Sequence, residues 1–382
     1  MRVVAFEQAV ALPFASCIMA ELGADVIKIE RPGSGDVVRG WDDYVEGLSS
    51  GFVAFNMGKR DITIDASKPQ GRMIIRELAA TADVFIENFT PGTVAKLGIG
   101  PEDLRGVNPR LVYCSLSGYG QDGPFKDVKA YDLLVQGESG ILLTNGYPDA
   151  PAKVGMPVTD LIAGSHAVMA VMGALIERGY DGLGSFIDLA LLDSAAFWLG
   201  YFPHQWWHRH EEPARGGMRH QFICPYGPFL AQDGRFVNVA VASEPHWKLF
   251  CEVVEQPLWR DDPRFDSMTS RRDNMQELNL LVADAISSKP SDHWSSRLAQ
   301  AGLPFGSVRS MSEVVEHPQL KHRRMFVKGS SPVGEIPMVR FPLSSPDKLR
   351  AVPGLGQHTD EVLGELGYGD DAIEVLRLDG IV

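Results

Sequence analysis

Hydrophobic residues in the first 120 positions fall into short β-branched runs separated by longer stretches with helical spacing. Five such runs predict strands, at 2–6, 25–30, 61–66, 83–89 and 111–120. Helical spacing predicts helices at 12–24 and 68–82, and shorter ones at 91–98 and 100–108. Strands that alternate with amphipathic helices are typical of a mostly parallel, doubly wound sheet. The predicted fold class is therefore α/β, with a Rossmann-like large domain.

The pattern changes in the second half of the chain. An apolar stretch from Asp160 to Gly179 predicts one long helix, and residues 203–225, rich in Gly, Pro, His and Trp, indicate a boundary. Residues 226–241 predict a hairpin that turns at Asp233-Gly234, because this pair tolerates positive φ. Further helices are expected at 244–256, 271–289 and 290–302.

A chain of 382 residues is long enough for two domains. We expect residues 1–204 to form the first part of the large domain and residues 205–310 a smaller α+β domain. Residues 311–382 are expected to return and complete the large domain. Within them, residues 352–368 predict a short amphipathic helix that packs on the first domain.

Charge and cysteine content narrow the function classes. The net charge of −13 argues against sequence-independent binding of nucleic acid, which needs a basic face. No stretch reaches the ~18 apolar residues that span a bilayer, so no membrane association is expected. The four cysteines (Cys17, Cys114, Cys224 and Cys251) form no CxxC pair and indicate neither a disulfide framework nor a zinc site. We expect a cytoplasmic protein.

Three polar loops follow predicted strands, at the sheet edge where doubly wound folds bind ligands. They span residues 30–40, 87–92 and 117–124. The first reads GSGDVVRG, which is not the GxGxxG fingerprint of a nicotinamide enzyme, and no P-loop or GxSxG elbow occurs. His204, His208 and His210 imitate metal-ligand spacing, but no HExxH-type partner exists, so no metal site is predicted.

Asp160 is the strongest candidate for chemistry, because it is a single acid at the start of an apolar helix. It can be a first-turn residue that the helix dipole favours. It can also be a nucleophile, since Ala163 and Gly164 leave room for a bulky electrophile. The glycines around Tyr119 fit either a plain turn or a loop whose N–H groups face a ligand.

Seven segments, in the expected order, resemble the class III CoA-transferases, the family that includes formyl-CoA transferase and the carnitine and bile-acid CoA-transferases. The segments are 22–40, 56–65, 87–98, 108–124, 130–140, 157–164 and 225–241. Together they cover nearly the whole chain. The resemblance implies a homodimer whose two chains pass through one another like linked rings.

The resemblance also implies a reaction. A CoA-transferase of this kind moves CoA from an acyl-CoA donor, here succinyl-CoA or another dicarboxylyl-CoA, to a C4–C5 dicarboxylate such as mesaconate, itaconate, citramalate or malate. Asp160 would attack the donor thioester, giving a mixed anhydride and then an aspartyl-CoA thioester. CoA is then a co-substrate, and no permanently bound cofactor is expected. Intramolecular transfer within one dicarboxylyl-CoA is the alternative form of the reaction.

The residues that match the family's CoA-binding positions are Val10, Ala11, Arg31, Asn88, Phe89, Lys96 and Lys129. Val10 stands where formyl-CoA transferase has a polar amide, and Lys96 replaces an Arg, which weakens bidentate recognition of phosphate. Residues 215–221 stand where relatives carry a glycine loop over the substrate, and Gly216 and Gly217 are its only glycines.

Two other functions fit the same residues. The fold also serves α-methylacyl-CoA racemases, which carry His immediately before the acid that here is Asp132. Tyr131 fills that position, and a phenol of ordinary pKa ~10 is a poor replacement for imidazole at neutral pH. The transferase is therefore preferred, and Tyr131 is assigned to the substrate side of the site. A CoA-binding protein without turnover is the third possibility.

Overall fold

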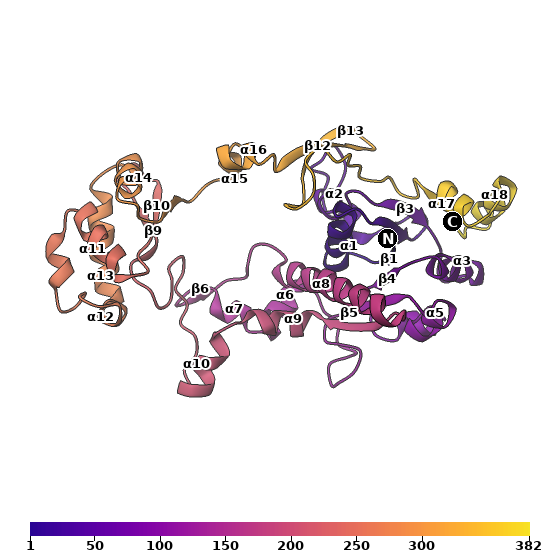
Figure 1. The fold of residues 1–382 in the computed structure, drawn as a ribbon, viewed down its shortest axis with the longest axis horizontal. Helices are drawn as coiled ribbons and strands as arrows, with labels where there is room; N and C mark the ends of the chain where they lie inside the picture. Colours follow the sequence, from indigo (N-terminus) through magenta and orange to yellow (C-terminus); the bar gives the residue numbers. More distant parts are fainter. The chain divides into compact units, whose positions relative to one another are not determined.

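The computed structural model describes residues 1–382, which contacts within the chain divide into two units. Unit 1 consists of Met1–Ile141, Val154–His204 and Pro318–Val382, and unit 2 of Leu142–Lys153 and Gln205–His317. Both chain termini lie in unit 1 (Figure 1). Unit 2 is therefore made of two segments, each of which leaves unit 1 and returns to it.

The core of unit 1 is a six-stranded parallel sheet with the order β3-β2-β1-β4-β5-β8. Its strands are β1 (Arg2–Phe6), β2 (Asp25–Glu30), β3 (Arg60–Thr63), β4 (Val84–Glu87), β5 (Val112–Ser117) and β8 (Phe186–Ala190). The sheet confirms the predicted mixed α/β class with a mostly parallel sheet. The chain order reverses between β1 and β4, the switch point at which such sheets bind ligands.

Helices cover both faces of this sheet, because successive strand residues point to opposite sides. Val4 of β1 faces one core, and its neighbours Val3 and Ala5 face the other. The first core is closed by α3 (Pro69–Ala80), α5 (Pro101–Val107), α17 (Thr359–Glu365) and α18 (Asp370–Leu378). The second is closed by α1 (Ala11–Glu21), α6 (Asp132–Glu138), α8 (Val158–Asp181) and α9 (Leu191–Trp198) (Figure 1).

Helix α8 begins at Val158, two residues before the predicted start. By length and composition it could cross a membrane. One of its faces, which includes Ala163 and Ala167, is instead buried in the core of unit 1. Gly164 lies directly against α1, because a Cβ placed there would be 2.4 Å from the carbonyl oxygen of Ala11. A small residue is thus required where the two helices cross.

The C-terminal segment is bound to the edge strand β3. Asp61 Oδ1 accepts a hydrogen bond of 2.6 Å from the Gly356 N–H, and the Asp61 N–H donates to His358 Nδ1 at 3.0 Å. Arg60 forms ion pairs with Glu361 and Glu365 of α17. Before this contact the segment forms the hairpin of β12 (Phe326–Ser331) and β13 (Gly334–Val339). The two ends of the chain therefore meet in one body.

Unit 2 contains an antiparallel sheet of β9 (Tyr226–Leu230), β10 (Phe236–Ala240) and β11 (Phe305–Ser307). The predicted hairpin is confirmed, and Gly234 has φ +76° in its turn. The sheet packs against α11 (Glu244–Val253), α13 (Met275–Ser287) and α14 (Ser291–Gln300). The single helix predicted for 271–289 is interrupted at Asn274, which separates α12 (Met268–Asp273) from α13.

Short elements complete the chain. Unit 2 also holds the hairpin of β6 (Gly146–Tyr147) and β7 (Ala150–Pro151). The remaining helices are η1 (Val37–Gly40), α2 (Ser50–Phe55), α4 (Thr93–Lys96), α7 (Ile141–Thr144), α10 (Phe202–Arg209), η2 (Pro257–Asp261), α15 (Met311–Val315) and α16 (Pro318–His322).

Two buried carboxyl groups, Glu30 and Asp61, share a proton at the seam between β2, β3 and the C-terminal segment. Burial and the neighbouring Glu30 raise the pKa of Asp61 to about 9. Burial also opposes ionisation of Glu30, but the Arg39 guanidinium and the proton from Asp61 outweigh it and lower the pKa of Glu30 to about 2. At neutral pH, Asp61 is therefore the neutral donor and Glu30 the charged acceptor.

We predict that Asp61→Asn flattens the pH dependence of stability. Folded Asp61 keeps a proton that the unfolded chain, with a carboxyl pKa of ~3.9, has lost, so wild-type stability falls as pH rises from about 4 to 9. An amide donates the same hydrogen bond without titrating. Urea unfolding should show that the free energy of unfolding falls less between pH 5 and pH 8 in the variant than in the wild type. A larger fall in the variant than in the wild type would contradict the assignment of the proton to Asp61. For comparison, Glu30→Gln removes the nearer carboxylate partner of Arg39 and leaves it only Asp61, 3.5 Å away, so this variant should be less stable than wild type at both pH values.

Candidate active site

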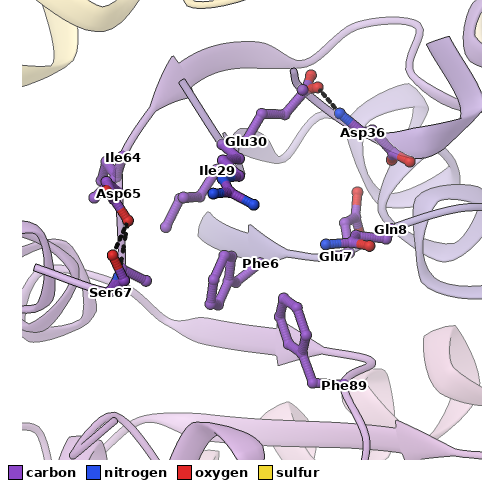
Figure 2. A pocket seen from close by; sticks show the side chains of 13 residues that line it. Phe6, Glu7, Gln8, Ile29, Glu30, Asp36, Ile64, Asp65, Ser67 and Phe89 are labelled. Atoms are coloured by element: carbon purple, nitrogen blue, oxygen red, sulfur yellow. Dashed lines mark hydrogen bonds between the residues drawn. The ribbon is translucent and has the colours of Figure 1, made fainter. Parts of the chain in front are cut away.

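A cavity of about 290 Å³ lies at the carboxyl ends of β1, β2, β3 and β4, at the switch point of the sheet. Its lining comes from residues 6–8 after β1, 29–31 with Gly35 and Asp36 after β2, 64–67 after β3, and Phe89 after β4 (Figure 2). The three loops that the sequence places at this edge contribute unequally: 30–40 and 87–92 line the cavity, and 117–124 does not.

The cavity combines an aromatic wall with one unpaired cation. The rings of Phe6 and Phe89 lie beside each other with centroids 4.5 Å apart (Figure 2). Arg31 also lines the cavity, and its exposed guanidinium forms no ion pair or hydrogen bond. Flat apolar surface suits a base, and a guanidinium suits a phosphate. The cavity thus has the chemistry to hold a nucleotide.

Buried charges hold the loop between β1 and α1. Lys28 donates to Asp36 Oδ2 at 2.9 Å, and Lys59 donates to Glu7 Oε1 at 2.8 Å; all four side chains are fully buried. Asp36 Oδ1 accepts the N–H of Ala9, whose φ of 63° is unusual for a residue with a side chain. Such strain persists only where surroundings fix it, as these ion pairs do here.

The same loop leads from the cavity to the start of α8. Asn88 bonds both main-chain groups of Gln8, accepting its N–H at 2.9 Å and donating to its carbonyl at 2.8 Å. Val10 and Ala11, the next residues into α1, are buried, and no side chain caps the helix there. Because Ala11 touches Gly164, the first turn of α1 lies against the first turns of α8.

Asp160 stands in the first turn of α8 and is half-buried. Its carboxylate forms no hydrogen bond and no ion pair. Burial, followed by the charge of Asp132, raises the pKa of Asp160 to about 7. An unpaired carboxylate with this pKa is ionised in part at neutral pH and is not stabilised by donors, which favours attack on an electrophile.

The helix cap is supplied by Asp132 instead. Its Oδ1 accepts both the N–H of Thr159 at 2.9 Å and the Thr159 hydroxyl at 2.8 Å, while Oδ2 accepts Gln136 Nε2 at 2.7 Å. Gln136 Oε1 in turn accepts the Val154 N–H at 2.9 Å. Asp160 therefore lies in the first turn, where the helix dipole favours an acid, but it does not cap α8, since the side-chain cap comes from Asp132 of α6.

The structure brings some of the predicted CoA residues together and leaves others apart. Arg31 and Phe89 line the cavity, and Asn88 supports its wall. Lys96 is exposed at the end of α4, and Lys129 donates to Thr90 Oγ1 at 2.9 Å, so neither lines the cavity. Tyr131 is 71% exposed immediately before α6.

The predicted glycine loop, in unit 2, is held against the β6–β7 hairpin. The Gly217 N–H donates to the Gly146 carbonyl at 2.9 Å, and Arg215 Nε donates to the Tyr147 carbonyl at 2.8 Å. Gly217 has φ +61°, and a Cβ there would lie 2.7 Å from the Tyr147 ring. Gly216 is also tightly enclosed, because a Cβ on this residue would lie 2.4 Å from the Arg219 carbonyl oxygen.

Thiol and metal chemistry find no support in the chain. All four cysteines are buried and unpaired, and burial raises the pKa of each thiol, to about 11 for Cys17 and to about 12 for Cys114, Cys224 and Cys251. Such thiols stay protonated and are poor nucleophiles. No group of three or more His, Cys, Asp or Glu side chains is placed to hold a metal ion.

Sequence reasoning missed the acids that organise the site. Glu7, Glu30 and Glu87 each close or directly follow a buried strand, and Asp132 lies in the segment 130–140, where nothing indicated that it caps another helix. A signal for the first three was present. In each, a carboxylate stands at the end of an apolar run, where a solvated loop does not need one. A strand end at the carboxyl edge of a parallel sheet is where ligands bind, so an acid there indicates a function.

Comparison with known proteins agrees with this geometry. The family model described as CoA-transferase family III matches residues 1–359. The chain is 33% identical to the succinyl-CoA:glutarate CoA-transferase of Mus musculus, covering 100% of this chain and 89% of that protein. It is 36% identical to the acetyl-CoA:oxalate CoA-transferase of Acetobacter aceti, covering 83% and 82%. It is 27% identical to the succinyl-CoA–D-citramalate CoA-transferase of Chloroflexus aurantiacus, covering 100% and 96%.

A solved structure shares the fold. The crystal structure of a CAIB/BAIF family protein from Brucella suis matches with a TM-score of 0.84 and 32% identity, over 96% of this chain and 98% of that one. The family match extends over nearly all of the chain, and the relatives above 30% identity cover most of it. The protein therefore belongs to CoA-transferase family III and is an enzyme of that type.

Proposed function

We propose that this enzyme transfers CoA from a dicarboxylyl-CoA donor, succinyl-CoA foremost, to a C4–C5 dicarboxylate through covalent intermediates at Asp160. An Asp160 oxygen attacks the thioester carbonyl, the C–S bond breaks, and the CoA thiolate leaves a mixed anhydride. The thiolate then attacks the aspartyl carbonyl, which releases the donor acid and forms an aspartyl-CoA thioester. The acceptor carboxylate attacks the carbonyl of the aspartyl-CoA thioester, which expels the thiolate and gives a second mixed anhydride. The thiolate then attacks the acceptor's carbonyl, so the acceptor leaves as its CoA ester and Asp160 is free again. Each bond broken is replaced, so no thioester is lost to water.

The observation that carries this proposal is the unpaired state of Asp160. A carboxylate in the first turn of a helix normally accepts main-chain N–H groups. Here Asp132 takes the Thr159 donors, and Gly164 brings α1 close without adding a side chain. The result is a half-buried oxygen nucleophile with open surroundings.

The substrate class comes from the relatives. Glutarate, oxalate and citramalate in their names are all dicarboxylates, and two of the three names have succinyl-CoA as donor. We place the nucleotide end of CoA in the cavity, with its base against Phe6 and Phe89 and a phosphate on Arg31. Lys96 and Lys129 stay assigned to phosphates outside the cavity, and Gly216, Gly217 and Tyr131 to the acyl end.

We further propose an interlocked homodimer. The resemblance to the family implies this arrangement, and the chain that leaves unit 1 after His204 returns to it at Pro318, as interlocking requires. Large apolar side chains also stay exposed on α8 and α9: Ile176 66%, Tyr180 90%, Phe197 78% and Trp198 60%. Exposed apolar residues of this size on neighbouring helices mark a surface that another chain covers.

Asp160→Asn should reduce CoA exchange between succinyl-CoA and glutarate at least about 1,000-fold, because the amide is not a nucleophile. The fold should be retained, as judged by circular dichroism. Glu177→Gln, which neutralises an exposed acid on the same helix, is the matched control and should exchange at the wild-type rate. Unchanged exchange in Asp160→Asn would end the proposal.

The pH profile should depend on Asp132. The attacking form of Asp160 is the carboxylate, so kcat/KM falls as pH drops below about 7. Asp132→Asn removes the like charge and keeps an oxygen for the Thr159 N–H, so the acidic limb should move to lower pH. Burial, the larger cause of the raised pKa of Asp160, remains in the variant and should keep the midpoint of this limb above the ordinary aspartate pKa of ~3.9. A limb that does not move would show that another group controls it.

Sedimentation should find a dimer at every concentration at which the chain is folded, since interlocked rings separate only on unfolding. A stable folded monomer would exclude interlocking.

In the same preparations, incubation of a branched acyl-CoA in deuterated water should leave the α-carbon unlabelled. Label at that carbon would favour the racemase instead.

A further inference from the structure

Glu87, the last residue of β4, has no part in the mechanism above, although it lies at the switch point of the sheet. It is paired in register with Phe6 of β1 on one side and with Ser115 of β5 on the other. Its side chain is only 2% exposed. No cation accompanies it, whereas Glu7 and Glu30 have Lys59 and Arg39. A carboxyl group buried without a cation carries a large desolvation cost, which calls for a specific role.

The hydrogen bonds of Glu87 reach two loops. Its Oε2 accepts the main-chain N–H of Phe89 at 2.9 Å, which fixes the residue that forms the aromatic wall of the cavity. Ser115 is its neighbour in register on β5 and lowers the pKa of the carboxyl group, and the Ser115 Oγ accepts Gln121 Nε2 at 2.8 Å. The Gln121 N–H then donates to Asp188 Oδ2 at 3.2 Å. One carboxylate therefore connects the loop after β4 with the glycine-rich loop after β5.

The first of these loops is fixed at Asn88 and at Phe89, of which Phe89 lines the cavity. Asn88 is bonded to the main chain of Gln8, and Phe89 is held by Glu87, so its ring is kept 4.5 Å from that of Phe6 (Figure 2). Without the Glu87 bond, the Phe89 N–H would lack a partner, and the loop would keep only the bonds of Asn88 and Thr90 on either side of Phe89. The aromatic wall would then lose its defined position.

We infer that Glu87 is a positioning residue for binding the nucleotide end of CoA, acting through Phe89 on the cavity wall and through Ser115 and Gln121 on the loop after β5. This inference rests on the proposed binding of CoA in the cavity. The carboxylate touches neither CoA nor the reacting atoms. Its effect should therefore appear in the affinity for CoA and in KM for the acyl-CoA, and not in kcat.

The charge state of Glu87 gives the inference a pH signature. Burial raises the pKa of Glu87 to about 7, against the opposing bonds from Ser115 and Phe89. The titratable groups that face it from β5 are Tyr113 and Cys114, whose own pKa values burial raises so far that both stay neutral near pH 7. Asp188 of β8 reaches the same network through Gln121. The ionised Glu87 is the stronger acceptor for the Phe89 N–H, so CoA affinity should weaken as pH falls below 7.

Calorimetric titration with coenzyme A itself tests this without turnover. Glu87→Ala should weaken CoA binding about 10- to 100-fold, the value of a hydrogen bond to a charged group, with kcat within about threefold of wild type. Glu87→Gln, which keeps an oxygen for the Phe89 N–H, should recover part of this affinity. Its CoA affinity should be independent of pH between 6 and 8. Ser115→Ala, which keeps the bond between Glu87 and the Phe89 N–H, should lose less CoA affinity than Glu87→Ala does.

Controls separate this inference from the proposed function. Glu102→Gln removes an exposed acid of α5 and should bind CoA as wild type does. If the wild-type enzyme binds no CoA, the proposed function fails. If it binds CoA and Glu87→Gln binds equally well with the same pH dependence, the inference alone fails. A fall in kcat without a change in CoA affinity would also overturn it. Should Glu87→Ala not fold, the Glu87→Gln titration decides the matter by itself.

Discussion

The crossing of α1 and α8 is the constraint on which the site depends. Gly164 allows the backbone of Ala11 into close contact, and this contact sets where the first turn of α1 lies against α8. A first-turn acid on α8 would ordinarily be consumed by capping. Asp132 reaches from α6 to bind Thr159, so the N-terminal donors of α8 are used and Asp160 stays available. Packing and hydrogen bonding thus create a carboxylate with no partner.

Carboxylates at strand ends organise the rest of the binding edge. Glu7 closes an ion pair with Lys59, Glu30 shares a proton with Asp61, and Glu87 accepts the N–H of Phe89. Each is buried, and each fixes a loop that leaves the sheet. A buried charge costs free energy when it is unpaired, and a buried pair is stable only in a narrow range of distances and angles. Such pairs therefore define loop positions that apolar packing alone would leave variable.

Much of this could be predicted from the sequence. Regular alternation of apolar runs indicated the parallel sheet through β5, and Asp160 stood out because it is a single acid at the start of an apolar helix beside small residues. The strand β8 was missed, because its exposed residues interrupt the apolar run, and so were the two-residue strands β6 and β7, which are too short to have a pattern. The break at Asn274 depends on tertiary packing that helical spacing does not encode.

Residue roles were harder to predict than elements. Arg31 and Phe89 follow strands directly, so topology alone brings them to one edge of the sheet. Lys96, at the end of α4, and Lys129, which donates to Thr90, lie farther from the strand ends in the chain, and neither lines the cavity. Asp132 became interpretable only when α6 and α8 were seen to touch, because its partner Thr159 is distant in the chain.

Covalent attachment to Asp160 is the most direct test of this account. The enzyme would be mixed with succinyl-CoA in the absence of acceptor, quenched in acid, digested and analysed by mass spectrometry. We predict a peptide containing Asp160 that carries the mass of coenzyme A and that disappears when glutarate is added before the quench. A peptide that stays unmodified while the enzyme exchanges CoA at its full rate, or an adduct on any other side chain, would contradict the central claim.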